Sequence, residues 1–181
     1  MALGWEGEKV RLVPLDKERH MDNILAWMSD PEVTEWTLIG DLPVTRLAEE
    51  DFFNRVTGPT GNHPTDIVLA IETLEGQHIG VAGIHRIEWR HGVAVTGTFI
   101  GPEEFRGRGY GSDAARTRAR YAFDVLGLRL LVSEVIADNT GSLKMLKRAG
   151  YVETGRIPRR YWKRGAYRDV VLLVAEREPR Q

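Results

Sequence analysis

Hydrophobic residues alternate with polar ones at the start of the chain and then recur every three or four positions. The alternation over residues 9–15 (KVRLVPL) predicts a first strand, and Pro14, which has no N–H to donate, indicates a sheet edge. Asp16 can cap a following helix, which Asp30-Pro31 ends. The apolar positions of that helix are Met21, Ile24, Leu25 and Met28.

A second helix and a β-rich run are expected next. Residues 32–42 are predicted to form a loop, after which Thr45 caps the second helix. Residues rich in β-branched side chains then fill three segments, at 67–71, 78–87 and 93–100. Because short glycine-containing turns join these segments, they predict an antiparallel meander.

The second half of the chain returns to alternating helix and strand patterns. Apolar residues at helical spacing predict a helix that runs to about Val125 and ends at Gly127. A strand is expected at 130–137, a short helix from residue 139, and two final strands of which the last covers 170–175.

The resulting order, β α α β β β α β α β β, predicts the α+β class with a central mixed sheet. No repeat, linker or low-complexity segment divides residues 1–181, so we expect a single domain. The helix between the strands at 93–100 and 130–137 should form a right-handed crossover that makes these two strands parallel.

Composition excludes several classes of function. The 181-residue chain has a net charge of −1, which argues against a general nucleic-acid binder. It has no cysteine, which excludes disulfides, thiolate metal ligands and a cysteine nucleophile. No apolar run approaches the roughly 20 residues that span a bilayer, so we expect a cytoplasmic protein without a membrane partner.

One glycine-rich stretch stands out, at residues 105–112 (FRGRGYGS). It lies between a predicted strand and a predicted helix, where unpaired backbone N–H groups and the helix dipole attract anions. Glycine lets the backbone approach a ligand closely, and Arg106 and Arg108 add positive charge. The alternative is a tight turn with two solvated arginines.

Two common phosphate-binding loops do not fit this stretch. A Walker loop needs Gly-Lys followed by Ser or Thr, which is absent from the sequence. A dinucleotide fingerprint needs G-x-G-x-x-G, whereas Gly107, Gly109 and Gly111 have the spacing G-x-G-x-G. About 70 residues follow the loop, which is too few for a doubly wound sheet of the usual length.

The motif Arg106-Gly107-Arg108-Gly109-Tyr110-Gly111 resembles the acyl-CoA signature Q/R-x-x-G-x-G/A of the GNAT acetyltransferases. Three further segments resemble the RimJ/RimL-like branch of that family, in the same order along the chain. They are residues 10–15 with Trp27 and 30–33, Asn139 and Ser142 with 149–151, and Gly155 with 163–169.

The resemblance implies an acetyl-CoA-dependent N-acetyltransferase with helices on both faces of its sheet. The fourth strand (93–100) would splay away from the fifth, and the loop, with Ser112, would hold the CoA pyrophosphate. The main chain of Thr98, Phe99 and Ile100 would bind pantetheine. Gly97 is either a bulge that opens the sheet or an ordinary weak point in the strand.

The resemblance also implies two polar residues near the thioester. Asn139 would contact the cofactor, although Asn is also a common N-cap. Many members carry a tyrosine that protonates the departing thiolate, but that position is Leu146 here. Ser142, directly or through water, is the nearest replacement, and a simple capping role is the alternative.

The general base is less clearly indicated. Relatives often carry a glutamate early in the fourth strand, where this sequence has Val95. Glu134 in the fifth strand is the first alternative, unless it faces solvent or an arginine, with Glu88 and His85 behind it. A chain of water molecules is a further possibility, and no metal is expected.

The acceptor would be a primary amine, either a protein N-terminus or a small molecule such as a polyamine, amino acid or aminoglycoside. Trp36, Tyr161 and Trp162 are expected to line its site, with ordinary packing or a homodimer contact as the alternative for the last two. The basic run over 156–164 is expected to be a solvated surface. A non-catalytic CoA-binding sensor or assembly module is the competing function, because Leu146 and Val95 replace two expected catalytic groups.

Overall fold

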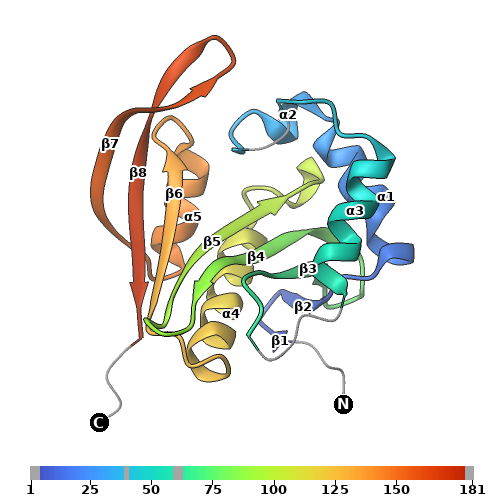
Figure 1. The fold of residues 1–181 in the computed structure, drawn as a ribbon, viewed down its shortest axis with the longest axis horizontal. Coiled ribbons are helices and arrows are strands. Elements are labelled where there is room, and N and C mark those ends of the chain that lie inside the picture. Colours follow the sequence, from blue (N-terminus) through green and yellow to red (C-terminus); the bar gives the residue numbers. More distant parts are fainter. Residues whose placement is uncertain (1–4, 39–40, 59–62, 178–181) are drawn as a thin grey trace.

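The computed structural model describes residues 5–38, 41–58 and 63–177. One sheet runs through it in the order β1-β2-β3-β4-β5-β6-β8-β7 (Figure 1). Only β5 and β6 are parallel, and every other neighbouring pair is antiparallel. The strands are β1 (Trp5–Glu6), β2 (Val10–Pro14), β3 (Ile67–Thr73), β4 (His78–Glu88), β5 (Val93–Ile100), β6 (Leu130–Ile136), β7 (Val152–Lys163) and β8 (Ala166–Glu176).

Helices cover both faces of the sheet, as expected for an α+β fold (Figure 1). They are α1 (Lys17–Met28), α2 (Pro31–Thr34), α3 (Arg46–Thr57), α4 (Tyr110–Asp124) and α5 (Thr140–Arg148). One apolar core lies between α4, α5 and strands β5, β6 and β8, and another lies between α1, α3 and strand β3. No helix in the described part of the chain is long and apolar enough to cross a membrane.

The N-terminal region contains two elements that the sequence pattern did not predict. Strand β1 pairs with Arg11 and Leu12, so β2 is not an edge strand, and Pro14 lies beyond this short pairing. Helix α2 occupies part of the expected loop because Asp30 caps it by accepting from Glu32 N at 2.8 Å. Pro31 therefore starts a new helix as well as following the old one.

The predicted splay is confirmed. β5 pairs with β6 only from Val93 to Val95, yet the two strands continue to Ile100 and Ile136. The predicted bulge at Gly97 is wrong, because Gly97 keeps its register opposite Gly83. The register shift lies in β4 between His85 and Glu88, where Arg86 has a φ of 49°.

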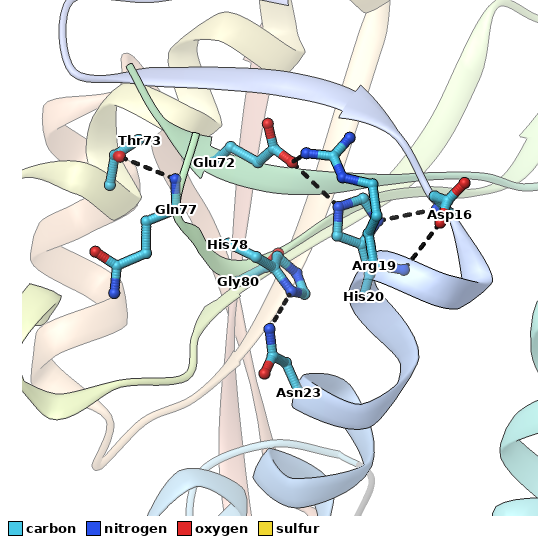
Figure 2. A network of polar contacts seen from close by, with 9 residues as sticks. All are labelled: Asp16, Arg19, His20, Asn23, Glu72, Thr73, Gln77, His78 and Gly80. Atoms are coloured by element: carbon cyan, nitrogen blue, oxygen red, sulfur yellow. Dashed lines mark hydrogen bonds and ion pairs between the residues drawn. The ribbon is translucent and has the colours of Figure 1, made fainter. Parts of the chain in front are cut away.

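A buried polar network fixes α1 against β3 and β4 (Figure 2). Glu72 accepts from Arg19 at 2.5 Å and lies 3.2 Å from His20 Nε2. His78 contacts Asn23 Nδ2 at 3.2 Å and the Gly80 carbonyl at 3.0 Å. Burial, with the nearby His20, lowers the pKa of His78 to about 4, so this ring is neutral in the fold.

Candidate active site

The glycine-rich loop leads directly into α4 without a side-chain cap. Gly107 and Gly109 have φ values of 72° and 91°, a region that side chains other than glycine rarely adopt. Gly109 is the N-cap residue, and the first intrahelical bond runs from Asp113 N to Gly109 O at 3.0 Å. The N–H groups of the first turn therefore remain available to an anion, with the helix dipole behind them.

The two loop arginines differ in their surroundings. Arg106 turns back and donates to the carbonyls of Ile100, at 3.2 Å, and Gly101. It therefore fixes the loop to the end of β5, and its contact with a phosphate stays a prediction. Arg108 is exposed at the mouth of the loop and can add charge there.

The remaining residues of the loop pack against neighbouring elements. A Cβ added to Gly111 would lie 2.6 Å from the sulfur of Met145, so this glycine allows α4 and α5 to approach closely. Ser112 is buried, and Tyr110 contacts the ring of Phe105 edge-on at 5.2 Å. The third glycine thus serves helix packing.

The open wedge between β5 and β6 presents strand backbone to a ligand. Thr96 O accepts from Ser133 Oγ at 3.0 Å, so the main-chain groups of Thr96 face β6. Because these groups alternate in direction along a strand, Thr98 also presents its N–H and C=O to the wedge. Phe99 is turned toward β4 instead, where it pairs with Val81, and Ile100 O is occupied by Arg106. Of the three predicted residues, Thr98 best suits pantetheine.

A buried arginine forms the floor of this wedge, and the sequence analysis missed it. Arg118 of α4 is 0% exposed and donates to Gly97 O, Thr98 Oγ1 and Tyr151 OH. In the described ranges, no carboxylate lies within ion-pair distance of it. The available signal was an arginine on a helix face otherwise lined by alanines, at positions 114, 115, 119 and 122. Arg118 thus connects α4 to β5 and to Tyr151 next to the point where β5 and β6 diverge.

Asn139 and Ser142 meet at the start of α5, next to the wedge. Asn139 Oδ1 accepts from Ser142 N at 2.9 Å, so Asn139 is the helix cap and Ser142 is not. The amide nitrogen of Asn139 remains for a ligand. Leu146, at the usual tyrosine position, is 2% exposed and packs in the core.

Comparison with known proteins agrees with this arrangement. The family model described as an acetyltransferase (GNAT) domain matches residues 9–152. The chain belongs to the GNAT acetyltransferase family. The enzyme class predicted from the sequence, an acetyl-CoA-dependent N-acetyltransferase, is the class of this family, whereas assignment to the RimJ/RimL-like branch stays a prediction.

Individual relatives are distant. The chain is 27% identical over 135 residues to the uncharacterized N-acetyltransferase p20 of Bacillus licheniformis, covering 74% of each protein. It is 30% identical over 102 residues to the uncharacterized N-acetyltransferase YoaA of Bacillus subtilis, covering 55% of this chain and 57% of that one.

Two solved structures share the GNAT fold. Spermidine N-acetyltransferase from Vibrio cholerae, in complex with CoA and spermine, superimposes with a TM-score of 0.82 at 18% identity, covering 92% of this chain and 95% of that one. A GNAT-family acetyltransferase from Bacillus anthracis gives a TM-score of 0.80 at 16% identity, covering 96% and 98%.

In this GNAT protein, Glu134 and Tyr161 come together beside the wedge. Glu134 Oε2 accepts from Tyr161 OH at 2.5 Å, and Glu134 lies in the part of β6 that has separated from β5. Burial, followed by the bond to Glu134, raises the pKa of Tyr161, so its hydroxyl stays a donor. The alternative in which Glu134 faces only solvent or an arginine is therefore wrong.

The two predicted tryptophans lie after α2 and near the end of β7, and they are not brought together. Trp162 is 61% exposed and lines a hollow of about 470 Å³ with Pro31, Asp41 and Arg164. Trp36 is half-buried after α2, and it does not line that hollow in the described part of the chain.

The tip of the β7–β8 hairpin is fastened to the region around α2. Lys163, which is 3% exposed, donates to Asp41 Oδ1 at 2.7 Å. Arg164 donates to Pro31 O at 2.8 Å and to Thr34 Oγ1 at 3.1 Å. The expectation of a solvated basic run is therefore wrong at its C-terminal end, where these cations hold the hairpin against Asp41 and α2.

A larger cavity of about 620 Å³ lies between α3, residues 63–66 and β4. His85 Nδ1 lies 3.0 Å from Asp66 Oδ1 at its wall. Burial raises the pKa of Asp66, but hydrogen bonds from Thr65 and His85 outweigh that effect and hold the pKa below its usual value. Glu88 is exposed beyond the β4 bulge.

Proposed function

We propose that this protein transfers an acetyl group from acetyl-CoA to a small polyamine-like primary amine. The observation that carries the proposal is the wedge between β5 and β6. The glycine-rich loop follows β5 and leads into α4, whose N-terminus has no side-chain cap. Such a site suits an extended ligand with an anionic group at one end. Spermine and CoA are bound in the complex of the Vibrio cholerae neighbour, which supports this pairing of substrates.

Binding of acetyl-CoA is assigned to three groups of atoms. The N–H groups at Gly109, Tyr110, Gly111 and Ser112, with the exposed Arg108, receive the pyrophosphate. Thr98 main chain pairs with pantetheine as an added strand would. Asn139 Nδ2 contacts the same arm while its oxygen caps α5.

Direct attack of the amine fits the absence of cysteine from the chain. The amine nitrogen forms a bond to the thioester carbonyl carbon, and the carbon–sulfur bond breaks. Ser142 delivers a proton to the departing thiolate, directly or through water, in place of the tyrosine that Leu146 replaces. Glu134, with Oε2 held by Tyr161, keeps a second oxygen for a substrate ammonium group.

The β7–β8 hairpin is held in place by Lys163 and Arg164, and we call these contacts the hairpin clamp. This clamp favours a small acceptor. The region between α2 and the hairpin, where the acceptor would enter, is called the acceptor side. A protein N-terminus needs an open groove, but Lys163 and Arg164 tie the hairpin to Asp41 and α2 across that side. Glu134 offers a carboxylate oxygen there that can pair with a polyamine ammonium, whereas Asp41 is neutralised by Lys163 and Arg164. A homodimer and a cytoplasmic location stay predictions from the sequence.

An acceptor panel tests the proposal. Release of the CoA thiol would be measured with spermidine, spermine, an aminoglycoside and an unblocked peptide, and acetyl-CoA binding would be measured by calorimetry. We expect turnover with the polyamines and little with the peptide. Acetyl-CoA binding without thiol release for any amine would instead support the non-catalytic CoA-binding module.

A further inference from the structure

A histidine of β4 lies beside the point where β5 and β6 separate, here called the fork of the wedge. The steps proposed above give this residue no role. His85 of β4 lies opposite Val95, and Val95 is the last residue of β5 that pairs with β6. The imidazole therefore lies level with the last paired residues of β5 and β6. It is on the face of the sheet that α3 covers, away from Arg118.

The ring of His85 extends along β4 toward Gly83. A Cβ added to Gly83 would lie 1.9 Å from His85 Nε2, and the next ring atoms would be 2.7 and 2.8 Å away. Nε2 is therefore the ring atom closest to the backbone of Gly83. No residue other than glycine fits beneath the ring without displacing it.

A second glycine clears the way from this nitrogen to the wedge. Gly83 pairs with Gly97 of β5, about 4.8 Å away across the sheet. Gly97 is exposed, and a Cβ added to it would meet nothing within 4 Å. The two facing glycines thus leave open space between Nε2 and the unpaired edge of β5, where an acetyl thioester bound along Thr98 would end.

The partner of His85 sets its tautomer. Asp66 is the acceptor for Nδ1–H at 3.0 Å, which leaves Nε2 with a free lone pair. Both side chains are partly exposed, at 39% and 42%, so the 620 Å³ cavity gives a route for protons to solvent. Arg55 from α3 and His63 from the preceding loop are the other charged or titratable groups that line this cavity.

We propose that His85, oriented by Asp66, is the general base of the reaction, which rests on the proposed amine acetylation. Nε2 takes one proton from the acceptor ammonium through water in the space above Gly83 and Gly97, and this proton leaves through the cavity. The neutral amine then forms the C–N bond, and the second proton that its nitrogen loses replaces the one that Ser142 gives to the departing thiolate. Glu134 is less suited, because its Oε2 is held by Tyr161. His20 and His78 are committed to the buried network.

The test compares His85→Gln with Asp66→Asn and with His63→Gln, a control on the same cavity. The pH dependence of kcat/KM for spermidine, acetyl-CoA affinity by calorimetry and thermal unfolding would be measured for each. We expect His85→Gln to lower kcat/KM at neutral pH by about 100-fold or more and to remove the acid limb of its profile. Acetyl-CoA affinity should stay within about twofold of wild type, since His85 touches no part of the proposed CoA site.

Asp66→Asn should lower kcat/KM by about tenfold and leave acetyl-CoA affinity unchanged, because the imidazole loses the carboxylate that fixes its tautomer and orientation. His63→Gln should keep the wild-type profile. An unchanged profile and rate in a folded His85→Gln protein would overturn the assignment while leaving amine acetylation intact. Absence of turnover by the wild-type protein with every amine would overturn both.

Discussion

At the scale of single residues, the proposed cofactor site depends on backbone conformation more than on side-chain chemistry. Gly109 combines a φ of 91° with the N-cap position of α4, so the first helical N–H groups point into the loop. Arg106 has a conspicuous position in the motif but bonds to the strand-end carbonyls. The glycine conformation is therefore the feature to test.

Gly109→Val should strain the loop and displace the N–H groups that we propose receive the pyrophosphate. We expect a loss of about tenfold or more in acetyl-CoA affinity by calorimetry, about 1.4 kcal/mol. Gly127→Val is the matched control, because Gly127 has a φ of 71° and open space around it but lies beyond the opposite end of α4. Both variants should lose about 1–3 kcal/mol of stability, but only the first should lose affinity. Equal affinities would exclude the loop from CoA binding.

At the scale of elements, the β7–β8 hairpin connects the sheet to Asp41 and α2, on the proposed acceptor side. Its arginine-rich sequence was expected to be solvated, since charge runs usually are. Pairing with the hydrophobic β8 instead extends it to Lys163 and carries that lysine into contact with Asp41. The length of β7 is thus determined by its pairing with β8 and not by the residues of β7 itself.

Asp41→Asn should loosen this clamp and raise the KM for the acceptor several-fold, with acetyl-CoA affinity unchanged. The cost in stability should be about 1–3 kcal/mol, because the Asp41 side chain is 42% exposed but the Lys163 side chain that it pairs with is only 4% exposed. Asp169→Asn, which removes the exposed pair with Arg156 on the same hairpin, is the control and should leave the acceptor KM near wild type. Steady-state kinetics with each substrate varied in turn would check this. An unchanged KM in the Asp41 variant would contradict the clamp.

At the scale of the whole molecule, α1 is held to the sheet by buried polar groups, and these connect global stability to pH. The pKa of His78 falls from its ordinary 6.5 to about 4 on folding. Between these values the unfolded chain binds a proton that the folded protein does not, so stability falls as pH drops from 6.5 toward 4. The loss attributable to His78 should reach roughly 3 kcal/mol at the lower limit.

Urea unfolding at pH 7.5 and pH 5 would check this for the wild type, His78→Asn and the exposed control His91→Asn. We expect a smaller difference between the two pH values in His78→Asn than in the other two proteins. The same difference in all three would show that His78 does not carry this pH dependence.

The sequence alone determined much of this protein. Alternation, helical spacing and caps at Asp16 and Thr45 predicted the main elements, because these signals depend on neighbouring residues only. The glycine motif predicted the anion site for the same reason, since its conformation is local. The order of motifs predicted the family and the splayed sheet.

The tertiary structure decided what depends on residues far apart in the chain. The pairing of Glu134 with Tyr161, of Lys163 with Asp41 and of His85 with Asp66 arises where separate elements meet. The same holds for Arg118, whose burial beneath the wedge no spacing rule indicates. The surroundings of His85 at the fork depend on which strands are neighbours and on the pairing of Gly83 with Gly97. Only tertiary packing determines these two features.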